Sequence, residues 1–304
     1  MSHPELLLVK NNAIDYAKWD QCISSAIIPL VYAHSWYLDI ISPNWDALIY
    51  GDYEFVMPLT SRRKLGWPLL LQPVYAQQHG IFPKADNEMQ NRFLSKVHEQ
   101  FRYVAVNLNA GHDQPFPDVF EVHTRKNHIL QLILPYDELK NNYSKHTRRQ
   151  LKKAEENKLF VVKGIQSKEF LDLKVSARKT KLSQPTMHTL KRLIEMGHSQ
   201  GNGVIYAAYT PDNMLCAAAF FLFAGHRVTY LNAVSTDEGK KTSAMHKIVD
   251  QFIQEHCGSL LTLDFEGSVI PGIARFYEGF GSSTEEYYFI KSNRLPIPLR
   301  WFKK

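Results

Sequence analysis

The sequence predicts an α/β protein in which two mixed α/β units follow one another along the chain. Three observations support this prediction. Apolar runs of strand length alternate with segments whose apolar residues recur at helical spacing. The second half has the order helices, strand, hairpin, helix, strand, helix, strand, and the first half has a similar order. The 304 residues are 44% hydrophobic and 22% charged, which is typical of a globular chain with a sizeable core.

The first half is expected to open with the strand ELLLVK and to continue with helices and strands in alternation. Helices are predicted at residues 16–24, 35–41 and 87–101. Strands are predicted at residues 5–10, 47–50, 54–60, 68–72 and 103–109. The segments VFEVHT and HILQLIL, residues 119–124 and 128–134, are expected to close this unit as a pair of strands.

The second half has clearer helix caps and turns. Ser144 or Thr147 can cap the first of the helices, which are predicted at residues 144–157, 168–180, 186–198, 242–257 and 271–280. Single strands are predicted at residues 159–164, 204–210, 259–265 and 285–291. Residues 215–225 and 227–235 are two strand-like runs joined by a Gly-His turn, which predicts a hairpin.

The boundary between the two domains is placed near residue 140, which gives domains of residues 1–140 and 141–304. The segment LPYDELKN is interpreted as a loop and connector. It is followed by NYSKHTRRQLKKAEENK, where the composition changes to six basic residues against two acidic ones.

The composition excludes several classes of protein. The longest apolar run, Met214 to Ala224, is too short to cross a bilayer, and the amino end has no signal-peptide pattern. Cys22, Cys216 and Cys257 are odd in number and show no paired spacing, so a cytoplasmic protein without disulfides is expected. The net charge of +6 and the pI near 9.0 permit an anionic partner without choosing one.

The second half also resembles a known superfamily. Its element order is similar to that of the GCN5-related N-acetyltransferase (GNAT) fold, and IARFYEGFG resembles the A..FYEK.GF segment near that fold's carboxyl end. Two such units, the second opened by YSKHTRRQLKKAEENKL and closed by LDFEGS and GIARFYEGFG, resemble the Fem-type peptidyltransferases and their uncharacterised acetyltransferase relatives. The resemblance covers most of the chain by element order, but by motif only residues 143–160 and 260–281. It implies two tandem GNAT-like domains and acyl transfer from acyl-CoA, such as acetyl-CoA.

Two positions depart from the family patterns. Fem-type proteins usually carry a lysine where this chain has Tyr277. A tyrosine at that position is the GNAT choice, in which the phenol protonates the departing coenzyme A thiolate. GNAT proteins also hold the pyrophosphate with a Gly-rich turn before the main helix, whereas the turn STDEGKKTSA contains Gly239 alone.

Asp264 and Glu266 are the candidate bases. Their i, i+2 spacing at a strand end can direct both carboxylates to one side of the sheet, where ligands of open α/β sheets bind. A carboxylate there can take a proton from an attacking amine. The alternative is that Asp264 closes the turn by accepting backbone N–H groups while Glu266 lies in solvent.

Tyr277 is the candidate acid. Its neighbour Phe276 is the better core residue, so Tyr277 is expected to face the ligand. A phenol keeps its proton at neutral pH and can give it to a forming anion. The alternative is an aromatic packing residue.

Phosphate binding is predicted at the turn before the helix at residues 242–257. Thr242 and Ser243 can cap this helix, whose N–H groups from Ala244 onward are unpaired, and Lys240 and Lys241 add charge. The site would suit the pyrophosphate of coenzyme A or the backbone of an RNA end, and the alternative is a solvated basic turn beside a capped helix.

Two further surfaces are candidates for substrates. The cations Arg148, Arg149, Lys152 and Lys153 could contact tRNA, although a charged helix face is more often simply solvated. In the first unit, Gln77 and Gln78, with Trp36 and Tyr37, could line a cleft between the units and orient the acceptor, or they could be core and loop-packing residues.

The leading hypothesis is direct acyl transfer from acyl-CoA to a small-molecule or peptide amine within a ternary complex. The histidines and cysteines show no metal-binding spacing, and no nucleophile motif is present. One alternative is a Fem-type enzyme that takes its acyl group from aminoacyl-tRNA and extends a cell-wall precursor. The other is a non-catalytic protein that binds RNA or anionic surfaces through the basic helix.

Overall fold

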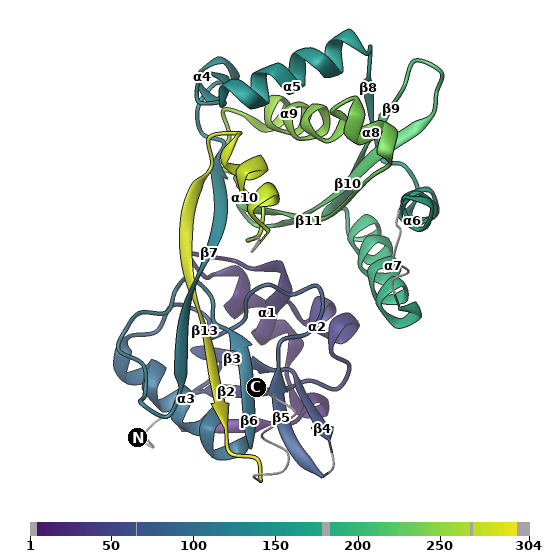
Figure 1. Ribbon diagram of the computed structural model, residues 1–304. Helices are drawn as coiled ribbons and strands as arrows, with labels where there is room; N and C mark the ends of the chain where they lie inside the picture. The colour runs from purple at the N-terminus through teal and green to yellow at the C-terminus, as the bar shows by residue number, and fades with distance from the viewer. Residues whose placement is uncertain (1–4, 65, 178–182, 268–269, 297–304) are drawn as a thin grey trace. The chain divides into compact units, whose positions relative to one another are not determined.

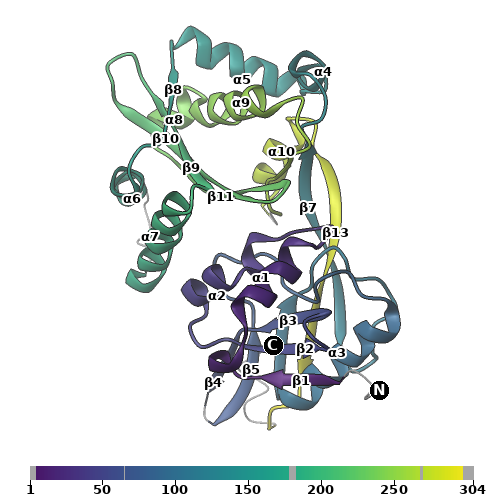
Figure 2. The same cartoon turned by 180° about the vertical axis from the view of Figure 1, so that it is seen from behind.

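The protein is described by a computed structural model, which covers residues 5–64, 66–177, 183–267 and 270–296 (Figures 1 and 2). The predicted mixed α/β class is confirmed. The chain forms two compact units, the first within residues 1–126 and 286–304 and the second within residues 127–285. Strands β7 (Glu121–Gln131) and β13 (Ser283–Asn293) each run from one unit into the other.

This division does not coincide with the division predicted near residue 140. Residues 127–140 belong to the second compact unit, and the residues from Glu286 onward return to the first. The reason is strand pairing, since the last half of β13 pairs antiparallel with β6 (Tyr103–Asn107) of the first unit.

The first unit contains two groups of strands and the helices that cover them. Its helices are α1 (Tyr16–Ser24), α2 (Ser35–Ile41) and α3 (Asn87–Gln100), with 3-10 turns at Asn11–Ala13 and Val31–Ala33. The strands β1 (Leu6–Val9), β2 (Asp46–Tyr50) and β3 (Phe55–Leu59) form an antiparallel sheet. The strands β4 (Ser61–Lys64) and β5 (Trp67–Leu71) lie beside β6, which β5 joins in parallel.

Helix α3 shows why these residues fold as they do. The Asp86 carboxylate accepts the backbone N–H of Met89 and so caps the helix. Phe93, Leu94 and Val97 recur at helical spacing and are fully buried in one cluster with the strand residues. The core of this unit therefore lies between α3 and the strands.

The second unit begins with α4 (Tyr136–Asn141) and the basic helix α5 (Lys145–Glu156). Its remaining helices are α6 (Ser167–Ser176), α7 (Gln184–Ser199), α8 (Asp237–Lys241), α9 (Ala244–His256) and α10 (Pro271–Glu278). Its strands are β8 (Phe160–Lys163), β9 (Gly203–Tyr209), β10 (Leu215–Ala224), β11 (Arg227–Ser235) and β12 (Thr262–Asp264). They are arranged in the order β7-β12-β11-β10-β9-β8, and only the β11–β12 pair among β7–β12 is parallel.

Helices cover both faces of this sheet (Figures 1 and 2). The side chains of β10 alternate between the two faces. Phe221 stacks on Phe252 of α9, with ring centroids 4.0 Å apart, whereas its neighbour Phe220 meets His198 of α7. Helices α5 and α9 therefore lie on one face, and α6 and α7 on the other.

Strand β11 has two irregularities, a bulge and an end to its pairing with β12. Phe221 pairs with Tyr230 and Phe220 pairs with Asn232, so Leu231 is an extra residue that forms a β-bulge. The parallel pairing with β12 ends at Thr229 and Asp264, and β11 then continues to Ser235. Residues 230–235 thus form an edge of β11 that β12 does not cover.

Three local predictions were wrong. The expected connector at residues 134–141 contains helix α4, which Pro135 precedes. The expected strand pair at residues 119–134 is the single strand β7, because the intervening residues contain no turn-forming glycine or proline. The expected turn before α9 contains helix α8, whose N–H at Gly239 is capped by the Thr236 hydroxyl. The carboxyl end of the helix predicted at residues 168–180 lies partly outside the described residues.

Gly239 provides the first test of this packing. A Cβ atom at this position would lie 2.2 Å from the carbonyl oxygen of Cys216, which belongs to the backbone of β10 and cannot move aside. Gly239→Ala should therefore lower the free energy of unfolding by about 2 kcal/mol, measured by urea denaturation. Gly272→Ala in α10 is the matched control because its Cβ would meet no atom within 4 Å, and it should be neutral or stabilising. Equal stabilities for the two variants would contradict the close approach of α8 to β10.

Candidate active site at the end of strand β12

A buried ion-pair network lies where the pairing of β12 ends. Arg227 Nε donates to Asp264 Oδ2 over 2.7 Å, and Arg227 Nη2 donates to Glu285 Oε2 over 2.5 Å. Asn127 Nδ2 lies 3.0 Å from Asp264 Oδ1 and 3.2 Å from Glu285 Oε2. Asp264 is completely buried, and the other members of the network come from β7, β11 and β13. The network holds the end of β12 in position.

Asp264 also closes the turn that follows. Its Oδ1 accepts the backbone N–H of Glu266 over 2.8 Å, as the alternative interpretation of its role predicts. Glu266 itself has a φ of 60°, a left-handed conformation that costs a non-glycine residue about 1–3 kcal/mol. This half-buried carboxylate is therefore held at the strand end by its neighbour's side chain.

Tyr277 of α10 lies beside these acids. Its ring stacks on Phe265, with centroids 4.9 Å apart, and contacts Tyr230 and His128 at 6.1 Å and 5.8 Å. Burial, and then the charges of Glu266 and Asp264, raise the pKa of the phenol above its ordinary value. No hydrogen bond from its hydroxyl is found within the described residues. The structure therefore brings Asp264, Glu266 and Tyr277 together, with the phenol protonated.

The expected packing of α10 was wrong in one respect. Tyr277 is the buried residue, and Phe276, expected in the core, is only half-buried. Successive helix residues point about 100° apart. When Tyr277 faces Phe265, Phe276 must therefore turn toward His246 of α9, whose ring centroid lies 4.8 Å away.

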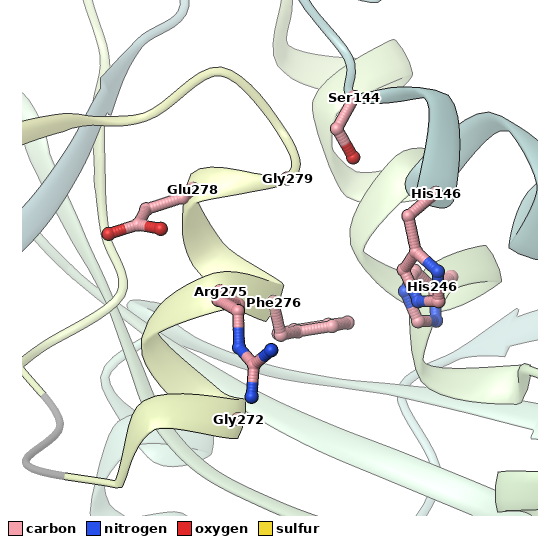
Figure 3. Close-up of a pocket in the computed structure, with 8 residues that line it drawn as sticks. All are labelled: Ser144, His146, His246, Gly272, Arg275, Phe276, Glu278 and Gly279. Atoms are coloured by element: carbon pink, nitrogen blue, oxygen red, sulfur yellow. The ribbon is translucent and has the colours of Figure 1, made fainter.

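A cavity of about 630 Å³ opens on that other side of α10 (Figure 3). Its lining comes from three helices: Ser144 and His146 at the start of α5, His246 near the start of α9, and Gly272, Arg275, Phe276, Glu278 and Gly279 of α10 and its end. Figure 3 shows Phe276 directed toward the two histidines and Glu278 directed away from them. The Glu278 carboxylate lies 3.4 Å from His128 Nε2.

The lining of the cavity contains both aromatic and polar side chains. Burial, and then the proximity of His146, lowers the pKa of His246 to about 4, so this imidazole is neutral at pH 7. A neutral imidazole can both donate and accept a hydrogen bond. With the guanidinium of Arg275 and the ring of Phe276, the cavity can hold a flat ring and an anionic group.

In the turn that was predicted to bind phosphate, the two hydroxyl groups form hydrogen bonds within the protein. Thr242 and Ser243 are buried, and their hydroxyls donate to the carbonyl of Glu238 and to Gln150 Oε1. Ser243 is the N-cap residue of α9, but its side chain makes no capping hydrogen bond. Ala244 is buried, Lys240 pairs with Asp237 over 3.2 Å, and Lys241 is exposed.

The other predicted contact residues lie in two places. Arg148, Arg149, Lys152 and Lys153 of α5 are all exposed, and Arg148 donates to the carbonyl of Asn141. In the first unit, Tyr37 donates to the carbonyl of Tyr75 and the fully buried Gln78 donates to Gln77.

Trp36 and Gln77 are half-buried, unlike Tyr37 and Gln78. Of these four residues, they keep the larger exposed surface for a ligand. Their role in acceptor binding stays a prediction.

Several residues of the site carried no sequence signal. Arg227 follows a hairpin turn, Glu285 opens an expected strand, and Asn127 lies between two expected strands. Their partnership joins positions up to 158 residues apart, so only the sheet brings them together. His146 and His246 likewise meet only because α5 packs beside α9.

The fold is GNAT-like, and the chain is similar in structure to several solved proteins. FemX is similar to this chain with a TM-score of 0.67 and 15% identity, over 95% of this chain and 98% of that one. The C-terminal domain of a lysylphosphatidylglycerol synthetase from Agrobacterium fabrum has a TM-score of 0.53 and 8% identity, over 92% and 93%. A GNAT-family acetyltransferase from Colwellia psychrerythraea has a TM-score of 0.50 and 10% identity, over 95% and 100%. At these identities, the likeness concerns the fold.

No family model and no curated protein matches the sequence of this chain. Within the described residues, no helix is both long and apolar enough to span a bilayer. The same residues contain no group of three or more histidines, cysteines or acids that could hold a metal ion.

Asp264→Asn tests the buried network. The amide keeps the shape of the side chain but removes the charge that faces Arg227, so the free energy of unfolding should fall by about 3 kcal/mol in urea denaturation. Asp237→Asn, which removes an exposed partner of Lys240, should change stability by about 0.5 kcal/mol or less. A loss no larger at Asp264 than at Asp237 would show that the network does not support the fold.

Proposed function

We propose that this protein is an acyltransferase that moves an acyl group from acyl-CoA to an amine by direct transfer. One observation carries the proposal. Tyr277 is a protonated phenol beside Asp264 and Glu266, and its hydroxyl has no hydrogen-bond partner in the described part of the chain. It lies next to Tyr230, where β11 continues past the end of β12. A substrate can therefore be the partner of this hydroxyl.

The reaction needs one bond made and one broken. The amine nitrogen attacks the thioester carbon, the C–N bond forms and the C–S bond breaks. Glu266 accepts the proton that the nitrogen loses, and Tyr277 gives its proton to the departing sulfur. The proton on Glu266 then returns to the phenolate, so the products are an amide and coenzyme A with its thiol restored.

The two proton transfers assist each other. The negative charge of Glu266 is one cause of the raised pKa of Tyr277. When Glu266 takes the amine proton, that charge disappears and the phenol becomes more acidic just as the sulfur leaves. Asp264 is committed to Arg227, Asn127 and the turn, so we assign it to positioning Glu266 rather than to proton transfer.

The cavity beside α10 suits the part of the donor that does not react. Arg275 can pair with a phosphate, and Phe276 with the imidazole of His246 can face an adenine ring. Helix α10 carries both Arg275 and Tyr277, so one rigid element would place the donor and its acid.

Tyr277→Phe tests the proposed acid. The variant keeps the stacking on Phe265 but has no proton to give, so kcat for acetyl transfer from acetyl-CoA to a panel of amines should fall about 100-fold with little change in KM. In the wild-type protein, the rate should not fall on the alkaline side below about pH 10, because the pKa of Tyr277 is raised above its ordinary value. An unchanged kcat in the variant would remove Tyr277 from the mechanism.

A titration identifies the donor. Coenzyme A should bind the wild-type protein, and Arg275→Gln should weaken binding about 10-fold by removing one charge-assisted hydrogen bond, as measured by calorimetry. Arg192→Gln, an exposed position on α7, is the control and should bind like the wild type.

The exposed cations of α5 favour a second candidate donor, aminoacyl-tRNA. If tRNA binds with a steep salt dependence and coenzyme A does not bind, the Fem-type alternative replaces the first proposal. Binding of tRNA without transfer of its aminoacyl group would instead indicate the non-catalytic alternative.

A further inference from the structure

Lys174 of α6 is one of the most deeply buried side chains of the second unit, with 1% of its surface exposed. Its Nζ donates to Oδ1 of Asn232 on β11 and lies 5.9 Å from the ring of Phe170. Burial of an ammonium group costs several kcal/mol unless it is paired and hydrogen-bonded. The hydrogen bond to Asn232 is one of the contacts that hold this ammonium group in the interior.

The β-bulge explains why Lys174 and Asn232 meet. Side chains that are paired across two antiparallel strands share a face of the sheet. Tyr230 is paired with Phe221 and faces α9, whereas Asn232 is paired with Phe220 and faces α6 and α7. Without the extra residue Leu231, the period of two would place Asn232 on the same face as Tyr230. The bulge thus places the side chain of Asn232 on the face of the sheet where Lys174 lies.

The lysine fixes the orientation of the amide. An ammonium group only donates, so the oxygen of Asn232 must face Lys174 and the Nδ2 group must point away. Asn232 is half-buried, and its Nδ2 group makes no hydrogen bond with any of the residues that the structure describes. Asn232 lies on the edge of β11 that β12 leaves uncovered, beyond the last pair at Thr229 and Asp264. An oriented pair of N–H donors therefore belongs to a residue of this edge and lies on the α6 face of the sheet.

We propose that Asn232 is a catalytic residue whose Nδ2 group donates a hydrogen bond to the carbonyl oxygen of the acyl group, and that Lys174 is its positioning residue. This inference rests on the proposed acyl transfer and adds a group that the reaction needs. The carbonyl oxygen becomes negative when the amine attacks, and a fixed donor there is worth about 100- to 1,000-fold in rate. In this reaction Tyr277 gives its proton to the sulfur, and Asn232 donates a hydrogen bond to the carbonyl oxygen.

Asn232→Asp is the decisive variant. An aspartate keeps the size of the side chain and offers Lys174 a full negative charge, so the thermal midpoint should stay equal or rise. The same change removes both N–H donors and repels a developing oxyanion. The expected result is a loss in kcat of about 100-fold for acetyl transfer from acetyl-CoA, with KM changed much less. An unchanged thermal midpoint together with an unchanged kcat would overturn the assignment.

Lys174→Met tests the positioning role. The apolar side chain of similar length removes the ammonium group and frees the amide of Asn232 to rotate, so kcat should fall about 10-fold in the wild-type background. In an Asn232→Ala background the same change should cost nothing further, because the group that it positions is gone. Additive losses in kcat would show that Lys174 acts otherwise. Lys168→Met, on the exposed part of the same helix, should leave kcat unaltered.

The two proposals fail in different ways. If the wild-type protein transfers no acyl group from acetyl-CoA or from aminoacyl-tRNA to any amine, the proposed function falls and the role of Asn232 falls with it. If the wild-type protein is active and Asn232→Asp keeps its kcat, only the role of Asn232 is wrong.

Discussion

The ion pair between Arg227 and Asp264 is the interaction on which the second unit depends most. It joins the first residue of β11 to the last residue of β12, in a place where both charges are almost completely excluded from water. A buried pair of this kind is tolerated only with further hydrogen bonds, and Asn127 and Glu285 supply them from β7 and β13. Four strands therefore meet at one set of charges. Because removal of Arg227 leaves the two carboxylates without a counter-charge, the network fixes the position at which the strand pairing stops.

The same network sets the chemistry of the site. Burial, and then the charges of Glu266 and Asp264, raise the pKa of Tyr277 and keep the phenol protonated. The carboxylate of Asp264 also accepts the N–H of Glu266 and so supports its left-handed backbone. The group assigned as the base thus receives its geometry from a residue that does not react. An enzyme site gains precision when such supporting contacts are buried and rigid.

The sequence alone could predict most of the fold and the local part of the site. Helices such as α3 and α9 followed from apolar spacing, and the β10–β11 hairpin followed from its Gly-His turn. Asp264, Glu266 and Tyr277 could be proposed as a group because they lie within one short segment of chain. The sequence could not single out Arg227, Glu285 and Lys174. A charged residue in a strand or helix pattern is normally solvated, and only the tertiary structure shows that it is buried. The exchange of Phe276 and Tyr277 was missed because phenylalanine is buried more often than tyrosine, and only the packing of α10 on Phe265 shows which ring turns inward.

One inserted residue connects the two sides of this site. The sheet separates the α9 and α10 side, where Tyr277 lies, from the α6 side, where Lys174 lies. In a regular strand, Tyr230 and Asn232 would point to the same side, because side chains alternate with a period of two. Leu231 breaks the alternation, so an aromatic contact of Tyr277 and the amide held by Lys174 follow each other along β11 on opposite faces. In the proposed reaction, Tyr277 would act on the sulfur from one face of the sheet and Asn232 on the carbonyl oxygen from the other.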